Sequence, residues 1–301
     1  MAKILLVTLI LLLGIAPMHA QDSGGTIMQV EFDSEMLHRP YQYNIYLPVG
    51  YEESEVRYPV IYLLHGRGDD MYAWLTVKPT LDQMIAEGDV PPMIAVMPDM
   101  PSLERASYYV DTEYNGGELV ESAFFNDLIP HIEATYRALS DRNARLVGGF
   151  SMGGYGAIRY AMAHPDSFAG ALVLSPAVYT PLPPLDSSTR EFGAFGNEDQ
   201  LFDQAIYTRL NYPALADSLA ESGLGLAMFI AVGDDEYHNP NPEDWLHDID
   251  LEAHLLYNRV ARIPNVSAEL RVYDGGHDWQ VWERGFVEGM TFLARLIDAG
   301  G

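Results

Sequence analysis

The sequence of 301 residues predicts one α/β domain built around a mostly parallel sheet. Val60–Leu64 and Met93–Met97 are short, continuous apolar runs bounded by turn residues, which is typical of strands covered on both faces. Strand and helix patterns alternate from about Thr26 to the end of the chain. We find no internal repeat and no low-complexity linker that would divide it.

The other elements follow from the same patterns. Further strands are expected at Thr26–Phe32, Gln42–Leu47, Arg145–Gly149, Ala171–Leu174, Leu226–Val232 and Ala268–Tyr273. Helices are expected at Leu81–Glu87, Ala123–Thr135, Tyr155–Ala163 and Glu283–Asp298. Pro130 should lie near a helix start or a kink, because proline has no N–H to donate. Thr180–Gln204 and Glu236–Asp248 look like insertions, and long loops of this kind often form substrate pockets or lids.

Composition excludes several classes of function. The chain has 43 acidic and 17 basic residues and a formal charge of −26, which repels phosphate backbones and anionic lipid. We therefore expect no nucleic-acid partner. We also expect no membrane insertion, because the body of the chain has no apolar stretch of about 18 residues. The absence of cysteine rules out disulfides, thiolate zinc sites and a cysteine nucleophile.

The first twenty residues have the pattern of a secretory signal peptide. Lys3 gives a positive start, Ile4–Ile15 is an apolar run too short to span a bilayer comfortably, and Pro17 ends it. Cleavage near Ala20 would leave residues 21–301 as one exported domain, secreted or periplasmic. The alternative is an uncleaved anchor.

Gly149-Phe150-Ser151-Met152-Gly153 is the strongest chemical signal in the chain. It lies between an expected strand and an expected helix, the context of a G-x-S-x-G nucleophile elbow. The serine hydroxyl would project at the carboxyl edge of the sheet, where the Met152 amide and the helix dipole could face an oxyanion. The alternative is a strand–turn–helix whose glycines serve packing alone.

His277 is the expected general base. It lies in Gly275-Gly276-His277, directly after the last expected strand, from which it could reach over the sheet edge. The acid that orients it should follow the strand Leu226–Val232, where Asp234, Asp235 and Glu236 are adjacent. Asp235 and Glu236 are the two candidates, since Asp234 is too close to the strand end. The order serine, acid, histidine is that of the α/β-hydrolase fold.

The same acidic loop has an alternative use. Its clustered carboxylates, within residues 234–252, could bind calcium, although their spacing matches no EF-hand. A second oxyanion donor is expected from the amide of Arg67, because Gly66 allows close approach of the backbone there. The Arg67 side chain is expected to pair with Asp69 or Asp70, or to contact a polar substrate.

The sequence resembles the esterase family that includes feruloyl and acetyl xylan esterases, enterochelin esterases, S-formylglutathione hydrolases and mycolyltransferases. The matching stretches are Tyr43–Tyr51, Tyr58–Gly66, Phe125–Tyr136, Gly148–Ala157, His164–Phe168 and Arg271–Trp282. The resemblance implies an α/β-hydrolase fold with helices on both faces of the sheet, Ser151 as nucleophile, His277 as base and the amides of Arg67 and Met152 as oxyanion hole. Family members usually carry the acid three or four residues after the strand-end glycine. Counting three from Gly233 gives Glu236, but aspartate is commoner there, so Asp235 and Glu236 both stay open.

The expected function is an exported serine esterase that works through an acyl-enzyme without metal or organic cofactor. The resemblance does not settle the substrate, and feruloyl or acetyl esters of plant polysaccharide are one expected class. Trp74 and Trp279 could stack on a substrate ring. The alternatives are acyl transfer of the mycolyltransferase type and a non-catalytic binding protein on a hydrolase scaffold. The sequence leaves the oligomeric state open.

Overall fold

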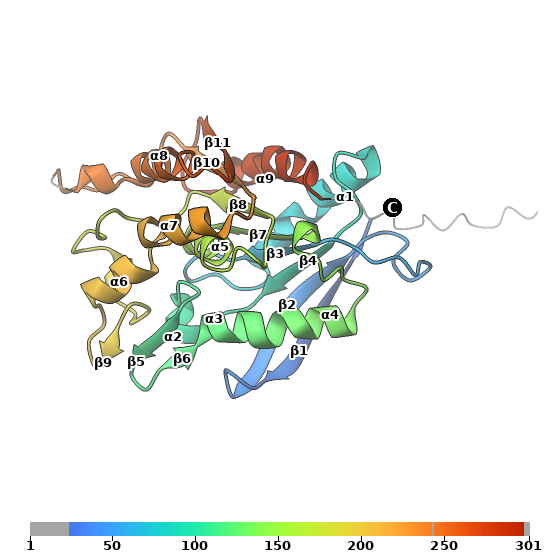
Figure 1. The fold of residues 1–301 in the computed structure, drawn as a ribbon, viewed down its shortest axis with the longest axis horizontal. Helices are drawn as coiled ribbons and strands as arrows, with labels where there is room; N and C mark the ends of the chain where they lie inside the picture. The colour runs from blue at the N-terminus through green and yellow to red at the C-terminus, as the bar shows by residue number, and fades with distance from the viewer. Residues whose placement is uncertain (1–23, 243, 298–301) are drawn as a thin grey trace, which may run out of the picture.

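A computed structural model describes residues 24–242 and 244–297, so the predicted signal peptide at residues 1–20 lies outside the described residues. Eight strands form the main sheet in the order β1-β2-β4-β3-β7-β8-β10-β11 (Figure 1). They are β1 (Thr26–Ser34), β2 (Arg39–Leu47), β3 (Val60–Leu64), β4 (Ile94–Pro98), β7 (Arg145–Phe150), β8 (Gly170–Leu174), β10 (Leu226–Gly233) and β11 (Val266–Tyr273). Only β1 with β2 and β2 with β4 pair antiparallel, which confirms the mostly parallel sheet.

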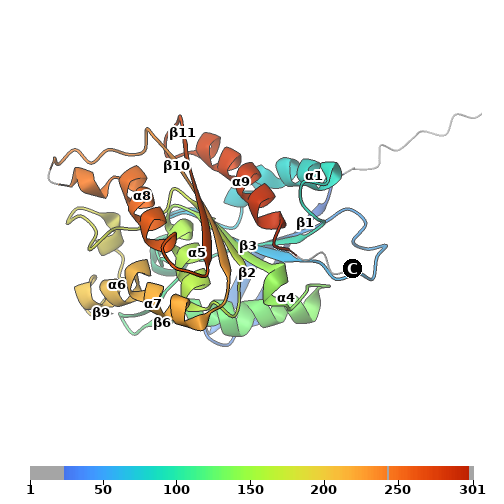
Figure 2. The same cartoon turned by 45° about the horizontal axis from the view of Figure 1, so that its top comes forward.

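Helices cover both faces of this sheet. The larger helices are α1 (Lys78–Glu87), α4 (Ile129–Thr135), α5 (Met152–Ala163), α7 (Tyr212–Ser222), α8 (Ile249–Val260) and α9 (Trp279–Ala294). Side chains alternate along β3: Ile61 and Leu63 pack in the core with α1 and α9, while Tyr62 and Leu64 pack in the core with α5, α7 and α8. Figure 2 shows α1 and α9 on one side of the sheet and α4 and α5 on the other. Among the described residues, no helix has both the length and the apolar character needed to span a bilayer.

Helix boundaries follow local chemistry more closely than the apolar pattern does. α9 begins at Trp279, four residues before the predicted start, because the Asp278 carboxylate accepts the Gln280 amide at 2.8 Å and caps the helix. The predicted helix around Pro130 is present as α3 (Val120–Ala123), a π-helical turn over Phe124–Leu128, and α4. The π-turn immediately before Pro130 accommodates the missing N–H and the bulk of the proline ring.

The two insertions contain short structure of their own. The first carries β9 (Asn197–Glu198), which pairs with β5 (Asp111–Tyr114), and β5 pairs also with β6 (Glu118–Leu119). The second carries the 3₁₀ turn η5 (Trp245–His247), which leads into α8. The remaining short elements are η1 (Ala73–Val77), α2 (Ser102–Arg105), η3 (Arg142–Ala144), η4 (Ser188–Arg190) and α6 (Gln204–Leu210).

The turn from β7 into α5 requires glycine at two positions. A Cβ atom on Gly149 would lie 2.1 Å from the carbonyl oxygen of Gly153. A Cβ atom on Gly153 would lie 2.1 Å from the carbonyl oxygen of Leu64, the last residue of β3. The first turn of α5 therefore packs directly on the end of β3, and this contact fixes how the loops after β3 and β7 meet.

Gly153→Ala should lower the free energy of unfolding by about 1–3 kcal/mol or more, because backbone, and not a flexible side chain, stands in the way of the new methyl group. The measurement is chemical denaturation of the purified variant. Gly225→Ala is the control, since the nearest atom to its Cβ, the Asn265 carbonyl oxygen, is 4.0 Å away. Equal stability of the two variants would contradict the close approach of Gly153 to the Leu64 carbonyl oxygen.

Candidate active site

Ser151 lies on the tight turn between β7 and α5 in a conformation that non-glycine residues rarely adopt, with φ 55° and ψ −119°. Its backbone is fixed on both sides. The amide N–H donates to the Leu174 carbonyl at 2.9 Å, and the carbonyl accepts from Tyr155 at 3.1 Å and Ala177 at 3.0 Å. Strain held in place by such contacts is a feature of functional sites. It presents Ser151 at the N-terminus of α5, beside the buried Met152.

His277 and Glu236 form a short hydrogen bond between the loops that follow β11 and β10. The distance from Nδ1 of His277 to Oε2 of Glu236 is 2.6 Å. The Glu236 side chain is fully buried, and the His277 side chain is 29% exposed. Because Nδ1 donates to the carboxylate, Nε2 is the ring nitrogen left to accept a proton from a nucleophile.

The buried carboxylate of Glu236 has two further donors. Its Oε1 accepts from the Ser175 hydroxyl at 2.5 Å and from the Gly233 amide at 3.1 Å. The Ser175 hydroxyl in turn accepts from the indole N–H of Trp282 at 3.0 Å. Three donors, including His277, compensate the loss of water around the carboxylate and hold it in one orientation. Sequence reasoning missed Ser175, whose only signal was its position directly after the expected strand Ala171–Leu174.

Asp235, the other acid candidate, lies elsewhere. Its backbone amide donates to Gly275 at 2.9 Å, while its side chain is exposed and has no contact with His277. Asp234, Asp235 and Asp274 form an exposed cluster whose carboxylate oxygens lie within 4.8 Å of one another. This cluster corresponds to the start of the acidic loop for which calcium was the alternative. Exposed carboxylates on their own do not define a cation site.

Aromatic packing brings the histidine and the serine to the same corner of the sheet. The ring of Phe150, which precedes Ser151, stacks on Trp282 at a centroid distance of 4.3 Å. The edge of the same indole meets the His277 ring at 5.1 Å. Within the described residues no hydrogen bond joins the Ser151 hydroxyl to His277. In ligand-free enzymes such hydrogen bonds are often long and tighten only when substrate binds.

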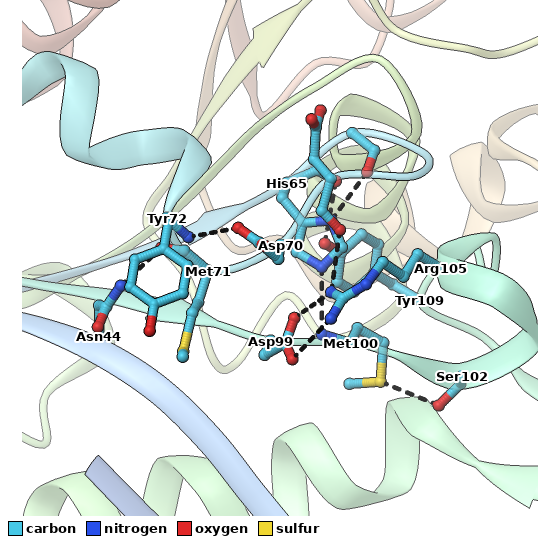
Figure 3. Close-up of polar contacts among 12 residues, drawn as sticks. Asn44, His65, Asp70, Met71, Tyr72, Asp99, Met100, Ser102, Arg105 and Tyr109 are labelled. Atoms are coloured by element: carbon cyan, nitrogen blue, oxygen red, sulfur yellow. Dashed lines mark hydrogen bonds and ion pairs between the residues drawn. The ribbon is translucent and has the colours of Figure 1, made fainter. Parts of the chain in front are cut away.

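The loop after β3 is held by a buried histidine (Figure 3). Nε2 of His65 accepts the Met100 amide at 3.1 Å, so the proton resides on Nδ1, which donates to the Gly66 carbonyl at 2.8 Å. Burial lowers the pKa of His65 and keeps this ring neutral. The Tyr109 hydroxyl donates to the His65 carbonyl at 3.0 Å. His65 therefore positions the backbone that leads to Arg67, and it is not available to a substrate.

Arg105 holds the same loop from the other side. Its guanidinium pairs with Asp99 and donates to the Asp69 carbonyl at 3.0 Å, while its own carbonyl accepts the Gly68 amide at 3.0 Å. The pair with Asp99 is visible in Figure 3. Partial burial and the neighbouring Asp70 carboxylate raise the pKa of Asp69, whose carboxyl group lies near Gly66.

The side chain of Arg67 does not form the ion pair expected from the sequence. Among the described residues it has no carboxylate partner, and its guanidinium lies 5.9 Å from the centroid of the Phe192 ring. Arg67 also lines a cavity of about 340 Å³ between the two insertions. The arginine therefore faces this cavity, and its neighbours Asp69 and Asp70 are not its ion-pair partners.

The two tryptophans expected to bind substrate differ in exposure. Trp74 is 0% exposed, donates its indole N–H to the Leu64 carbonyl at 2.9 Å and packs between Phe150 and Phe286. It is a core residue with no free surface for a substrate ring. Trp279 is partly exposed and packs edge-on against Trp74, so it keeps a face that a substrate could reach.

Arg105→Met should loosen the loop at residues 66–70, because it removes the ion pair with Asp99 and the hydrogen bond to Asp69. Hydrogen bonds to charged groups contribute about 1.5–3 kcal/mol, so amide exchange of this loop should accelerate about tenfold or more. Hydrogen–deuterium exchange with mass spectrometry measures this. Arg284→Met, which removes an exposed ion pair on α9, is the matched control and should leave the loop unchanged. Equal protection of residues 66–70 from exchange in both variants would contradict the role of Arg105 in holding this loop.

The sequence matches the family described as Putative esterase over residues 34–293, which is most of the chain. The bifunctional endo-1,4-beta-xylanase/feruloyl esterase of Xylanibacter ruminicola is 30% identical over 171 residues, but these are 52% of this chain and only 22% of that protein. The acetyl esterase of Caldicellulosiruptor saccharolyticus is 24% identical over 90% of this chain and 99% of its own length.

Among solved structures, a ferulic acid esterase superposes with a TM-score of 0.73 and 25% identity, covering 91% of this chain and 99% of that one. The chain therefore belongs to the Putative esterase family and has the α/β-hydrolase fold.

Proposed function

We propose that this protein is an exported serine esterase that hydrolyses carboxylic esters through an acyl-enzyme. The observation that carries the proposal is the hydrogen bond of 2.6 Å between His277 Nδ1 and the buried Glu236, on two loops beside the strained Ser151. Export rests on the signal-like pattern of residues 1–20, and we propose that the exported part is a single domain.

The first half of the reaction forms the acyl-enzyme. Ser151 Oγ attacks the ester carbonyl carbon while His277 Nε2 takes the hydroxyl proton. The carbonyl oxygen becomes an oxyanion and accepts hydrogen bonds from the backbone amides of Arg67 and Met152. The tetrahedral intermediate then breaks its bond to the alcohol oxygen, which leaves with the proton from His277.

The second half releases the acid. His277 takes a proton from a water molecule whose oxygen attacks the acyl carbon. The second tetrahedral intermediate then breaks its bond to Ser151 Oγ, which takes the proton back from His277 as the carboxylic acid leaves. Glu236 stabilises the imidazolium and keeps the proton of the resting ring on Nδ1. The two donors at its Oε1, Ser175 and Gly233, support this role because they hold the carboxylate still.

Feruloyl or acetyl esters of plant polysaccharide are the proposed substrate class. The names of the relatives support this class, since one is a feruloyl esterase joined to a xylanase and another is an acetyl esterase. A cavity of about 340 Å³ beside Arg67 is at the small end of the range of about 300–1,000 Å³ for ligand pockets, which suits a compact acyl group.

Ser151→Ala should reduce kcat by about 10⁴- to 10⁶-fold, because without the hydroxyl no acyl-enzyme forms. The measurement is hydrolysis of p-nitrophenyl acetate, butyrate and decanoate, methyl ferulate and acetylated xylan by protein beginning at Gln21. Ser222→Ala, on the exposed end of α7, is the control and should keep full activity. Full activity of Ser151→Ala on every ester would rule out this nucleophile.

Glu236→Gln should lower kcat by about 10³- to 10⁴-fold, because an amide cannot hold the imidazolium and can reverse the tautomer of His277. Asp235→Asn removes a charge from the adjacent residue and should change kcat less than threefold or so, since exposed charges act weakly. Steady-state kinetics on the best ester of the panel decide between them. A larger loss in Asp235→Asn than in Glu236→Gln would reverse the assignment of the acid.

A further inference from the structure

Two glutamate–histidine pairs lie in the described residues outside the proposed catalytic centre, His164 with Glu121 and His247 with Glu252, and the second of them adjoins a cavity. Nδ1 of His247 is 2.7 Å from Oε1 of Glu252, which also accepts the Thr180 amide at 2.8 Å. The Glu252 side chain is fully buried and the His247 side chain is 20% exposed. The contacts thus join both insertions to the first turn of α8.

Burying the Glu252 carboxylate beside His247 lowers the stability of the fold. Oε2 of Glu252 is buried and has no hydrogen-bond partner among the described residues. Burial raises the pKa of Glu252, although the hydrogen bonds from His247 and Thr180 oppose the rise. A carboxylate kept buried with one oxygen unsatisfied is a feature that packing alone does not explain, and such groups concentrate at functional sites.

The pair lies at the cavity beside the oxyanion loop. His247 lines the cavity of about 340 Å³ together with Arg67, Tyr179 and Tyr237. Arg67 follows β3 at the proposed oxyanion site, and Tyr237 directly follows the proposed triad acid. The lining thus includes a residue of the proposed oxyanion site and the sequence neighbour of the proposed triad acid, and two of its residues are tyrosines, of which Tyr237 is 68% exposed. The Tyr179 ring meets the His247 ring edge-on at a centroid distance of 6.4 Å.

The hydrogen bond to Glu252 determines which ring nitrogen of His247 is free to bind a ligand. With Nδ1 engaged, Nε2 is the free ring nitrogen, and no described residue bonds to it. The carboxylate makes this nitrogen a stronger acceptor, just as Glu236 does for His277. A phenolic hydroxyl is a good donor for such a nitrogen, and the Tyr179 ring, which meets His247 edge-on, offers an aromatic partner for the phenol ring.

We propose that the Glu252–His247 pair recognises the substrate: His247 Nε2 accepts a hydrogen bond from a phenolic hydroxyl on the acyl group, while Glu252 orients the ring. The inference rests on the proposed function, because it takes the cavity as the acyl pocket of the ester bound at Ser151. His247 determines specificity and Glu252 is a positioning residue, and neither takes part in bond breaking.

The test compares methyl 4-hydroxycinnamate with methyl cinnamate, which differ only in the phenolic hydroxyl. Wild-type protein should prefer the hydroxylated ester about tenfold in kcat/KM, the fold-change expected of one hydrogen bond. His247→Leu should reduce the preference to less than about twofold. The readout is the ratio of the two kcat/KM values within each variant, so a general loss of activity does not imitate a loss of recognition. A preference that survives in the variant, or one absent from the wild type, would overturn the proposal.

Because His247→Leu leaves Glu252 without its partner, a second variant guards against misfolding. His247→Leu with Glu252→Met replaces both polar groups by apolar ones, which buried pairs tolerate better than loss of one member. It should lose the same preference between the two methyl esters. His254→Leu, an exposed histidine on α8, is the matched control and should retain the wild-type preference.

Binding separates this proposal from the proposed function. In the Ser151→Ala background, free 4-hydroxycinnamate should bind about tenfold tighter than cinnamate by calorimetry, and the double change at His247 and Glu252 should abolish the difference. If no ester is hydrolysed but this difference is found, the esterase assignment fails and hydroxyl recognition stands. If esters are hydrolysed but both acids bind equally, the recognition role fails and the esterase stands.

Discussion

The contact between the first turn of α5 and the end of β3 is the constraint on which the site depends. A methyl group at Gly153 would meet the Leu64 carbonyl oxygen at 2.1 Å, so only glycine permits the approach. The contact sets Ser151 beside the loop that carries Arg67. His65 and Arg105 then fix that loop through hydrogen bonds to its backbone. The proposed nucleophile and oxyanion donors are thus positioned by backbone packing, which varies little with the substrate.

The buried glutamates Glu236 and Glu252 differ in how many hydrogen-bond donors their carboxylate oxygens have. Glu236 has three donors, one of them the Ser175 hydroxyl, so it is rigid and satisfied. Glu252 has donors on one oxygen only and leaves the other unpaired. Each holds a histidine through Nδ1. The first histidine packs on Trp282, which stacks on Phe150, the sequence neighbour of Ser151. The second lines the cavity beside Arg67, where we propose that the same geometry serves recognition.

Much of the fold follows from local pattern. Apolar runs such as Val60–Leu64 predict buried parallel strands, and the glycine-flanked Ser151 predicts the turn that follows β7. Family resemblance and chain order then indicate His277. These signals lie in short segments or in the order of segments along the chain, so a single sequence is enough to predict the features from them.

Other features depend on the folded loop. Asp235 and Glu236 are adjacent in sequence, and only the path of the chain after Gly233 turns one inward and the other to solvent. Trp74 is buried by packing against Phe150, which its position in an expected loop does not reveal. The pairing of His247 with Glu252 brings a loop and a helix together, and in sequence both residues look like surface positions.

The most direct test of the central claim is the site of covalent labelling by a fluorophosphonate, which reacts with an activated serine and leaves a stable adduct. Intact-mass and peptide-mass spectrometry of the labelled protein would locate the adduct. The account predicts one adduct, on Ser151, formed rapidly in the wild type and at least about a hundredfold more slowly in His277→Ala, because the hydroxyl then lacks its base. A labelled residue other than Ser151, or labelling that does not slow without His277, would contradict it.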